Sequence, residues 1–351
     1  MEKVKLLGMT PAQLKEVALE AGLPAYAGIQ LAQWLYKRRV RTVDAMTNIS
    51  KAGREKLAEK YEVGVIEPSE VFESSDGTKK YLFPVTCRLS KTPGAAEESS
   101  TVEAVMIPDE DRRTLCVSSQ AGCKMGCKFC MTGRQGFHGH LSVADILSQF
   151  IAIDEAEDLS NAVFMGMGEP LDNYDNVMAA IEVLTADWGF AWSPKRITLS
   201  TIGVMPQLGR FLKESRCHLA VSLHDPLPEE RGELMPVQKT FPLEKVLEEI
   251  SRHDFTGQRR VSFEYTMFRG LNDDKLHAAA LIRLLKGIPC RVNLIRFHKI
   301  PDFPYDTTPE PVMEMFRDRL SAAGITCTIR ASRGEDIFAA CGLLAGRHDK
   351  K

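Results

Sequence analysis

The sequence predicts an α/β fold: a partial (βα)6 barrel of the TIM type, with a small N-terminal helical module and a β-hairpin extension. Between residues 113 and 323, six strand-like runs alternate with six helix-like runs. This order is typical of a parallel sheet covered by helices. No glycine-rich dinucleotide fingerprint follows the first of these strands, which favours an open barrel over a doubly wound sheet. The 351 residues suffice for one large domain and a small one.

The N-terminal module is expected to cover residues 1–62. Thr10 and Pro11 mark a helix start, because threonine caps a first turn and proline fits its first position. A second helix carries an apolar stripe and ends in the basic run 37–41. The stripe consists of Ile29, Leu31, Trp34 and Leu35. A third helix is expected over 51–61. The basic run is either a solvated helix end or a contact to nucleic-acid phosphates.

The connecting extension, residues 63–108, contains two strand-like runs at 79–89 and 101–107, and the polar residues 90–100 between them indicate a loop. The barrel is expected over 109–351. Its strands are expected near 113–118, 161–165, 195–200, 217–223, 259–267 and 290–296. Its helices are expected near 142–154, 174–186, 204–214, 242–253, 273–286 and 309–323.

Glycine-rich and polar residues follow the second strand, where the loops of a βα barrel build the active site. The segment 166–170 reads Gly-Met-Gly-Glu-Pro. Gly166 and Gly168 allow a ligand to approach the backbone closely, and Glu169 can accept hydrogen bonds from an ammonium group. The segment is also compatible with an ordinary strand-to-helix turn.

Other polar residues lie at the ends of later strands. Ser200 ends the third strand, Ser222, Leu223 and His224 end the fourth, and His298 lies just beyond the sixth. The hydroxyl and imidazole groups can bind ribose hydroxyls or a carboxylate. Taken singly, such residues are more often found as turn or helix-capping residues.

Three cysteines follow the first strand of the barrel. Cys123, Cys127 and Cys130 have the spacing CxxxCxxC, whereas closed zinc and iron–sulfur sites usually have four ligands. Three thiolates on a cubane iron–sulfur cluster leave one iron open for a small molecule. The alternatives are a zinc site completed by a distant cysteine or histidine, and chance clustering among nine cysteines.

Two single cysteines are expected near the same edge of the barrel. Cys341 lies in a glycine-flanked loop after the last strand, and Cys116 lies on the strand that leads into the three cysteines. Such a pair is suited to thiol chemistry, either a disulfide or a covalent intermediate. Two buried structural thiols are the alternative.

The composition is that of an ordinary globular protein, with 44% hydrophobic and 26% charged residues. No apolar run reaches the ~20 residues of a membrane span. An odd number of cysteines and a start, Met1–Lys5, without a secretion signal favour the reducing cytoplasm. The net charge of −2 gives no general nucleic-acid signature, so an RNA partner requires local basic patches.

The cysteine spacing, Phe129 before its last cysteine, and the segment 166–170 resemble the radical S-adenosylmethionine (SAM) superfamily. Further segments make the resemblance specific, and nearly end to end the chain is similar to the RlmN branch of the radical SAM RNA methyltransferases. These segments are 32–36 with 46–48, 102–107, 115–123, 165–171, 199–203, 221–224, 233–236, 293–295 and 336–342.

The resemblance implies one [4Fe–4S] cluster on Cys123, Cys127 and Cys130, and two SAM molecules per turnover. It implies SAM contacts from several loop residues, with His298 standing where the family commonly has asparagine. These residues are Gly168, Glu169, Ser200, Ser222, Leu223, His224 and His298.

The resemblance also implies three catalytic residues. Cys341 takes a methyl group from one SAM, and a second SAM, cleaved at the cluster, supplies the radical that activates this methyl group for addition to adenine. Cys116 then attacks the sulfur of Cys341 and releases the product, leaving a disulfide that must be reduced. Glu103 accepts a proton during release.

The implied substrate is carbon 2 of an adenosine in 23S rRNA near the peptidyl transferase centre, with the tRNA adenosine next to the anticodon as a second target. The implied partners are these RNAs and an electron donor such as flavodoxin or ferredoxin, acting with a monomeric, cytoplasmic enzyme and no membrane. The competing hypotheses are methylation of carbon 8, a radical SAM maturase of peptides, and a non-catalytic RNA-binding protein stabilised by zinc or a cluster.

Overall fold

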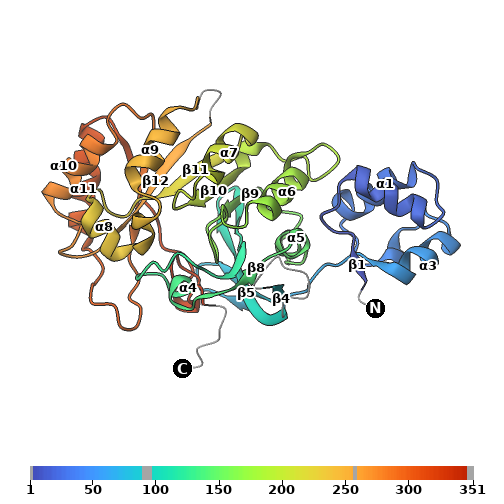
Figure 1. Cartoon of the computed structure of the whole chain (residues 1–351). Helices are drawn as coiled ribbons and strands as arrows, with labels where there is room; N and C mark the ends of the chain where they lie inside the picture. The colour runs from blue at the N-terminus through green and yellow to red at the C-terminus, as the bar shows by residue number, and fades with distance from the viewer. Residues whose placement is uncertain (1–2, 89–96, 256–258, 346–351) are drawn as a thin grey trace.

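The computed structural model describes residues 3–88, 97–255 and 259–345. Most of the chain forms one body around a long mixed sheet, and the N-terminal residues form a smaller lobe at one side (Figure 1). In the part of the chain described, no helix combines the length and the apolar character needed to cross a membrane.

Seven strands of the long sheet are parallel, in the order β6-β9-β10-β11-β12-β13-β14. Their bounds are β6 Arg112–Cys116, β9 Asn161–Phe164, β10 Ile197–Thr201, β11 His218–Ser222, β12 Val261–Met267, β13 Arg291–Arg296 and β14 Thr326–Ile329. The first six confirm the expected strands. The seventh, β14, is not among the strands expected from the sequence.

Helices connect these strands and cover the sheet, as the alternation of patterns predicts. The expected six are α5 Val143–Ile151, α6 Tyr174–Thr185, α7 Gln207–Glu214, α9 Leu243–Ser251, α10 Lys275–Leu284 and α11 Glu310–Ala322. Two short helices, α4 Met131–Arg134 and α8 Pro228–Leu234, were not expected. Short 3-10 turns lie at Pro194–Arg196, Pro236–Lys239 and Glu335–Ile337.

The hairpin extends the sheet beyond β6. Strands β4 (Lys79–Arg88) and β5 (Glu97–Asp109) pair antiparallel, and β5 pairs with β6. Strand β3 (Glu70–Glu73) pairs with β4, and β7 (Gln120–Gly122) and β8 (Phe137–His140) follow on the far side of β4.

The loop expected over 90–100 is partly replaced by strand. Residues 97–100 belong to β5, because their backbone pairs with 85–88 of β4, and paired backbone groups override a polar sequence. Residues 90–96 lie outside the described residues.

The N-terminal lobe contains the three expected helices. They are α1 Pro11–Glu20, α2 Ala27–Ala32, continued by a π-helical turn at Gln33–Lys37, and α3 Lys51–Lys60, with a 3-10 turn at Val43–Ala45. Thr10 caps α1 in a capping box with Gln13. The short strands β1 (Val4–Lys5) and β2 (Tyr61–Glu62) pair parallel and close the lobe. Of the expected apolar stripe, Ile29 is 60% exposed and the other three residues are buried.

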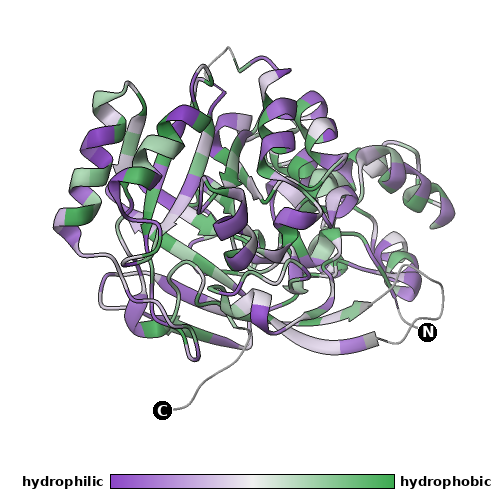
Figure 2. Ribbon diagram, turned by 60° about the vertical axis from the view of Figure 1, so that its left-hand side comes forward, coloured by the Kyte–Doolittle hydropathy of each residue, from purple (hydrophilic) through white to green (hydrophobic). Residues whose placement is uncertain are grey.

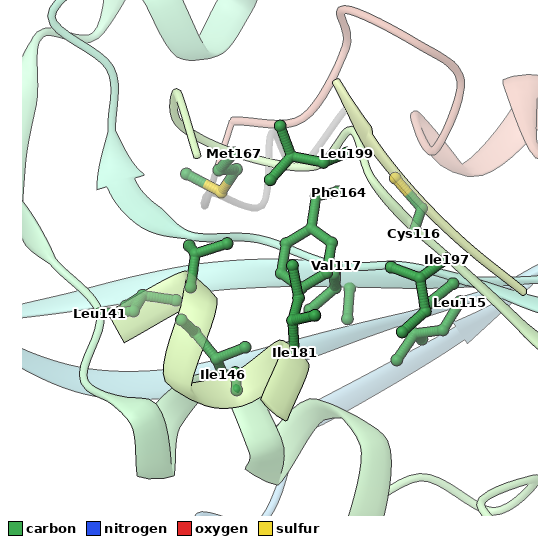
Figure 3. Packing of buried hydrophobic residues seen from close by; sticks show 14 of the residues in the cluster. Leu115, Cys116, Val117, Leu141, Ile146, Phe164, Met167, Ile181, Ile197 and Leu199 are labelled. Atoms are coloured by element: carbon green, nitrogen blue, oxygen red, sulfur yellow. The ribbon is translucent and has the colours of Figure 1, made fainter. Parts of the chain in front are cut away.

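The core fills the space between the sheet and its helices. Apolar side chains of β6, β9 and β10 pack against α5 and α6, and Figure 3 shows Leu115, Phe164 and Leu199 close to Ile146 and Ile181. The strands carry mostly hydrophobic residues while the outer faces of the helices are hydrophilic (Figure 2). A rigid sheet of this kind fixes the loops that leave its strand ends.

Candidate active site

The three-cysteine loop runs from β7 to α4. The Cys123 N–H donates to the Gly136 carbonyl at 2.8 Å, and the Cys130 N–H donates to the Cys127 carbonyl at 3.2 Å. Burial raises the pKa of the Cys123 thiol to about 12. The pKa of the Cys127 thiol is also raised. Burial is the largest cause, and the thiols of Cys130 and Cys123 raise it further. The three thiols therefore face one space, and a positive group must enter that space to favour their thiolate forms.

The spacing of the sulfur atoms fits a cluster better than a single ion. Cys123, Cys127 and Cys130 do not form a group of metal-ligating atoms within 4.8 Å of one another. A tetrahedral zinc ion holds its sulfur ligands only about 3.8 Å apart, from bonds of about 2.3 Å. A cubane is a larger body and takes thiolates that are farther apart. The donor set thus fits a [4Fe–4S] cluster.

The glycine segment after β9 packs tightly on the loop after β6. Gly168 has φ +96°, and a Cβ there would lie 2.5 Å from the Gln120 Cβ. The Gln120 Oε1 atom accepts a hydrogen bond from the Glu169 N–H at 2.8 Å. This close approach explains why glycine is required at position 168 and how Glu169 is oriented.

We expect Gly168→Ala to destabilise the protein by more than Gly270→Ala, its matched control. Both glycines have positive φ, but nothing lies within 4 Å of a Cβ at Gly270. The backbone strain of about 1–2 kcal/mol is shared, and overlap with Gln120 adds about 1–3 kcal/mol at Gly168 alone. Urea unfolding of the two variants measures the difference. Equal midpoints would contradict the proposed close packing.

Glu169 is buried and joins two strand ends. Its carboxylate accepts hydrogen bonds from the Thr201 hydroxyl at 2.6 Å, the Ile202 N–H at 3.0 Å and the Leu171 N–H at 3.1 Å. Burial raises the pKa of Glu169 to about 7, against the lowering effect of the Thr201 hydrogen bond. One carboxylate oxygen, Oε2, accepts the Ile202 hydrogen bond and has a second lone pair for a ligand. An ammonium group there would favour the ionised form.

Residues at the ends of β10 and β11 lie beside this segment. Ser200 and Ser222 are half-buried, whereas Leu223 is buried. His224 has φ +56° and is also buried. Its Nδ1 atom accepts from the Thr266 N–H at 3.0 Å, which assigns the ring proton to Nε2. Burial lowers the pKa of His224 to about 3, so the ring is neutral.

His224 also connects the fourth strand to the cysteine loop. Its ring packs edge-on against Phe129, with centroids 4.9 Å apart. Phe129 in turn contacts Phe268 at 5.3 Å. The aromatic residue before the third cysteine therefore holds the cysteine loop against the barrel wall.

His298 lies beyond β13, as expected, and both of its ring nitrogens contact the protein. Nε2 lies 3.1 Å from the Ser332 hydroxyl, and Nδ1 lies 3.3 Å from the Glu335 carboxylate. Its role as a SAM contact stays a prediction. In this structure it connects the sixth strand to the segment before Cys341.

The C-terminal loop that carries Cys341 is attached to α4. The Met131 N–H donates to the Gly342 carbonyl at 2.8 Å, and the Thr132 hydroxyl donates to the Leu344 carbonyl at 2.7 Å. Gln135 donates to the Ala345 carbonyl. Cys341 itself is exposed. The loop thus presents a free thiol next to the three-cysteine loop.

Cys116 is the buried neighbour of Cys341. Burial raises the pKa of Cys116, and the Cys341 thiol raises it further, which places the two sulfurs near each other. Both are free thiols in the structure. Cys116 pairs with Val105 across β5 and β6, so Cys116 and Glu103 share one face of the sheet.

Glu103 is buried near the end of the chain that the structure describes. Its carboxylate lies 3.5 Å from the Lys80 ammonium and accepts from the Ala345 N–H at 3.3 Å. The three predicted catalytic residues therefore gather around residues 341–345, although they come from three distant parts of the sequence.

Two buried charges in the site were not expected from the sequence. Arg231 is fully buried and donates to the Leu223 and Ser222 carbonyls, both at 3.0 Å, next to Cys127. Glu264 on β12 is 3% exposed, and its Oε2 atom has no hydrogen-bond partner. Glu264 could have been singled out from the sequence, because a charged residue within an apolar strand is unusual. Arg231 could not, because it lies in a segment of other polar residues.

Comparison with known proteins agrees with this geometry. Residues 117–282 match the radical SAM superfamily and residues 4–63 match the ribosomal RNA large subunit methyltransferase N-terminal domain. An RlmN protein of Porphyromonas gingivalis is 58% identical over 98% of this chain and 94% of its own length. The dual-specificity RNA methyltransferase RlmN of Syntrophus aciditrophicus is 38% identical over 99% of this chain and 98% of its own length.

Among solved structures, a radical SAM methyltransferase from Sphaerobacter thermophilus superimposes with a TM-score of 0.89. It is 35% identical, over 98% of this chain and 100% of that chain. These similarities extend over nearly the whole length of this chain, from the N-terminal lobe through the barrel. The chain belongs to the RlmN family of radical SAM methyltransferases.

Proposed function

We propose that this RNA methyltransferase methylates carbon 2 of an adenosine in 23S rRNA, near the peptidyl transferase centre, and the tRNA adenosine next to the anticodon. The observation that carries the proposal is the exposed residue Cys341, whose loop is attached to α4 next to the three cysteines, with the buried Cys116 beside it. An exposed thiol can take up a methyl group and present it to a base. A buried neighbour can later attack its sulfur.

The reason for a protein-bound methyl group lies in the substrate. Carbon 2 of adenine stands between two ring nitrogens and is electron-poor, so it cannot attack SAM as a nucleophile. Cys341 can, because a thiolate is a strong nucleophile, and its methylation is a simple displacement. Cys123, Cys127 and Cys130 would hold the [4Fe–4S] cluster. When bound, the cluster and a second SAM supply a radical that takes a hydrogen atom from a methyl group.

Residues around the glycine segment would bind SAM. The Glu169 carboxylate would accept hydrogen bonds from the methionyl ammonium, and Gly168 would let the ligand approach the backbone. Ser200 and the segment 222–224 would contact the ribose or the carboxylate, with His298 as a further contact. The neutral His224 ring offers one donor, Nε2–H, and adds no positive charge near the SAM sulfonium.

Release of the product would use the other two residues. Once the radical adduct has lost one electron, for which the oxidised cluster would be the acceptor, the Cys116 thiolate attacks the Cys341 sulfur. The bond from that sulfur to the methylene carbon breaks, and a Cys116–Cys341 disulfide forms. The electron pair stays on the carbon, which takes up a proton and becomes the methyl group. Glu103 accepts the proton that leaves the ring carbon. The Lys80 ammonium beside Glu103 favours a carboxylate, the form that can accept a proton. An electron donor of the flavodoxin or ferredoxin type would supply the electron for SAM cleavage, and the disulfide must be reduced to thiols before the next turnover.

The N-terminal lobe would bind RNA as one handle of a monomeric, cytoplasmic enzyme. The proposal divides the chain into this module, residues 1–62, a connecting hairpin, 63–108, and the catalytic barrel, 109–351. In the basic run, Arg39 donates to the Ala156 carbonyl and Arg41 to the Ile151 carbonyl, so these two attach the lobe to the barrel. Lys37 and Arg38 remain exposed for phosphates.

A groove of about 520 Å³ supports this assignment. Lys37 and Arg38 line it together with Ile29 and Trp188, and the guanidinium of Arg38 lies 4.3 Å from the centre of the Trp34 ring. Exposed apolar and aromatic surface beside basic groups suits an unpaired nucleotide, whose base stacks while its phosphate is neutralised.

We expect the double variant Lys37→Glu with Arg38→Glu to bind RNA more weakly and to cleave SAM at an unchanged rate. Each lost phosphate contact should lower the slope of log affinity against log salt by about 0.7–0.9. The control is Arg283→Glu with Lys286→Glu, the same charge change at the end of α10 and in the turn after it. Deletion of residues 1–62 should weaken RNA binding as the Lys37 and Arg38 variant does. Filter binding at several salt concentrations measures the slope. Equal slopes for the two double variants would refute the role of the lobe.

The regiochemistry is tested by mass spectrometry of nucleosides from a strain that lacks this protein. Loss of 2-methyladenosine from rRNA and tRNA, restored by the intact chain, is the expected result. Loss of 8-methyladenosine instead would favour the carbon 8 hypothesis. Unchanged nucleosides would leave neither position as the target and would contradict the proposal.

A further inference from the structure

A second cluster of ligand-type side chains lies outside the proposed catalytic residues. Asp225 follows β11, Glu230 lies on α8, and His277 lies in the first turn of α10. One ligand atom from each lies within 4.8 Å of the others. The His277 Nε2 atom is 3.1 Å from the Glu230 Oε2 atom and 4.0 Å from the Asp225 Oδ2 atom.

These spacings suit one metal ion. Bonds of about 2.0–2.2 Å from nitrogen and carboxylate oxygen place neighbouring ligand atoms about 2.8–3.8 Å apart. The 3.1 Å separation lies in this range, and the 4.0 Å separation reaches it when the side chains move together slightly on binding. The other ring nitrogen of His277, Nδ1, lies 2.8 Å from the Asp274 carboxylate. A carboxylate on the second nitrogen is the usual support of a metal-binding histidine, because it fixes the ring orientation and the tautomer.

One oxygen in the cluster lacks a hydrogen bond. Asp225 is 0% exposed, and its Oδ1 atom accepts from the Leu227 N–H at 2.8 Å, but its Oδ2 atom has no hydrogen-bond partner. Buried carboxylate oxygens without partners are costly. This Oδ2 atom is the one that faces His277 and Glu230. It therefore has lone pairs that are available to coordinate a cation.

We propose that Asp225, Glu230 and His277 bind one divalent cation that accepts mixed nitrogen and oxygen ligands, such as Mn²⁺ or Zn²⁺. Two carboxylates and a neutral imidazole balance its charge. Imidazole with carboxylates suits such ions, whereas Ca²⁺ and Mg²⁺ prefer oxygen alone. The Glu230 side chain is 36% exposed, so the ion has a path from solvent, and water can complete the coordination.

The ion would stabilise the loop that carries the predicted SAM contacts. It would join α8 and α10 to the residue that follows His224. The His224 carbonyl already accepts from the Asn272 side chain at 2.7 Å, just before α10. A cation at Asp225 would therefore hold the same loop from its next residue, at a site separate from the three cysteines.

An ion pair is the competing explanation. A protonated His277 between Asp274 and Glu230 would give the same two short contacts, with Asp225 completing the charge. The two explanations differ in whether a cation binds. Cysteine thiolates are zinc ligands in general, so added zinc would not report on one site. The test therefore uses Mn²⁺ on the cluster-loaded enzyme, with the cluster kept oxidised.

The experiment titrates Mn²⁺ and follows the loss of its free resonance by electron paramagnetic resonance. We expect one bound equivalent, with spin-echo modulation from one imidazole nitrogen. Glu230→Gln should weaken binding by at least tenfold, and Asp274→Asn by about 10–100-fold. Glu229→Gln, an exposed neighbour on the same helix, makes the same charge change and should bind as the parent does.

Thermal melting with and without Mn²⁺ checks that Glu230→Gln is folded and gives a second measure of binding, because a ligand of the native state raises Tm. A melting temperature that rises with Mn²⁺ in the parent and in Glu229→Gln, but not in Glu230→Gln, supports the site. No bound Mn²⁺, or equal binding by the Glu229 and Glu230 variants, would overturn it and leave the ion pair as the explanation.

Discussion

Cys116→Ala should accumulate a covalent protein–RNA adduct, whereas Cys341→Ala should never attach to RNA. Without Cys341 there is no methyl acceptor, so the sequence of steps cannot begin. Without Cys116 the methyl group can still be taken up and added to the base, but no thiolate attacks the Cys341 sulfur. The adduct is visible as a nuclease-sensitive shift in a denaturing gel after anaerobic turnover.

The control for these two variants is Cys327→Ala, which removes another buried thiol. Cys327 has no role in the proposed scheme, so this variant should turn over normally. Replacement of Glu103 by Gln should slow release, because the ring proton has no acceptor. Normal turnover by Cys116→Ala without trapped RNA would contradict the resolving role and make both cysteines structural thiols.

Cys127→Ala should lose the iron–sulfur cluster. Two thiolates cannot replace three on a cubane whose fourth iron is already open, and the buried Arg231 charge would lose the anionic group that it faces. Anaerobic purification should give about four irons per chain for the parent and almost none for the variant. SAM cleavage should disappear with the iron.

Cys290→Ala is the matched control, because Cys290 is half-buried like Cys127 but lies just before β13, away from the cysteine loop. It should retain its iron and its colour. Stoichiometric zinc and no iron in the anaerobic parent would contradict the cluster assignment, as would full iron content in Cys127→Ala.

The sequence predicted the barrel well because its strands are apolar runs at regular spacing and its helices carry ordinary start signals, such as Ser142 at the N-cap of α5. Strand β14 was missed because Thr326–Ile329 is a short edge strand of alternating polar residues. Its position depends on pairing with β13, a long-range effect that local pattern does not contain.

The site residues also divide into those that local sequence patterns predict and those that depend on long-range contacts. The three cysteines and Glu169 stand at strand ends, where the barrel topology alone places them together. Arg231 could not be predicted, because its partners are the Ser222 and Leu223 backbone carbonyls, and every residue has such a carbonyl. The two contacts of His298 with Ser332 and Glu335 likewise depend on the path of a loop.

The attachment of the N-terminal lobe has a consequence for substrate choice. Arg39 and Arg41 reach barrel carbonyls, Tyr36 packs against Trp188 at 5.4 Å, and Lys5 pairs with Asp145 at 3.3 Å. Together these contacts hold the lobe against the barrel, so the distance from the exposed Lys37 to the thiol of Cys341 is fixed. On the proposed function, this fixed distance would be a criterion for substrate choice: an RNA would be accepted when its fold offers a phosphate and an unstacked adenosine at that separation. Two RNAs unrelated in sequence can satisfy one such measurement.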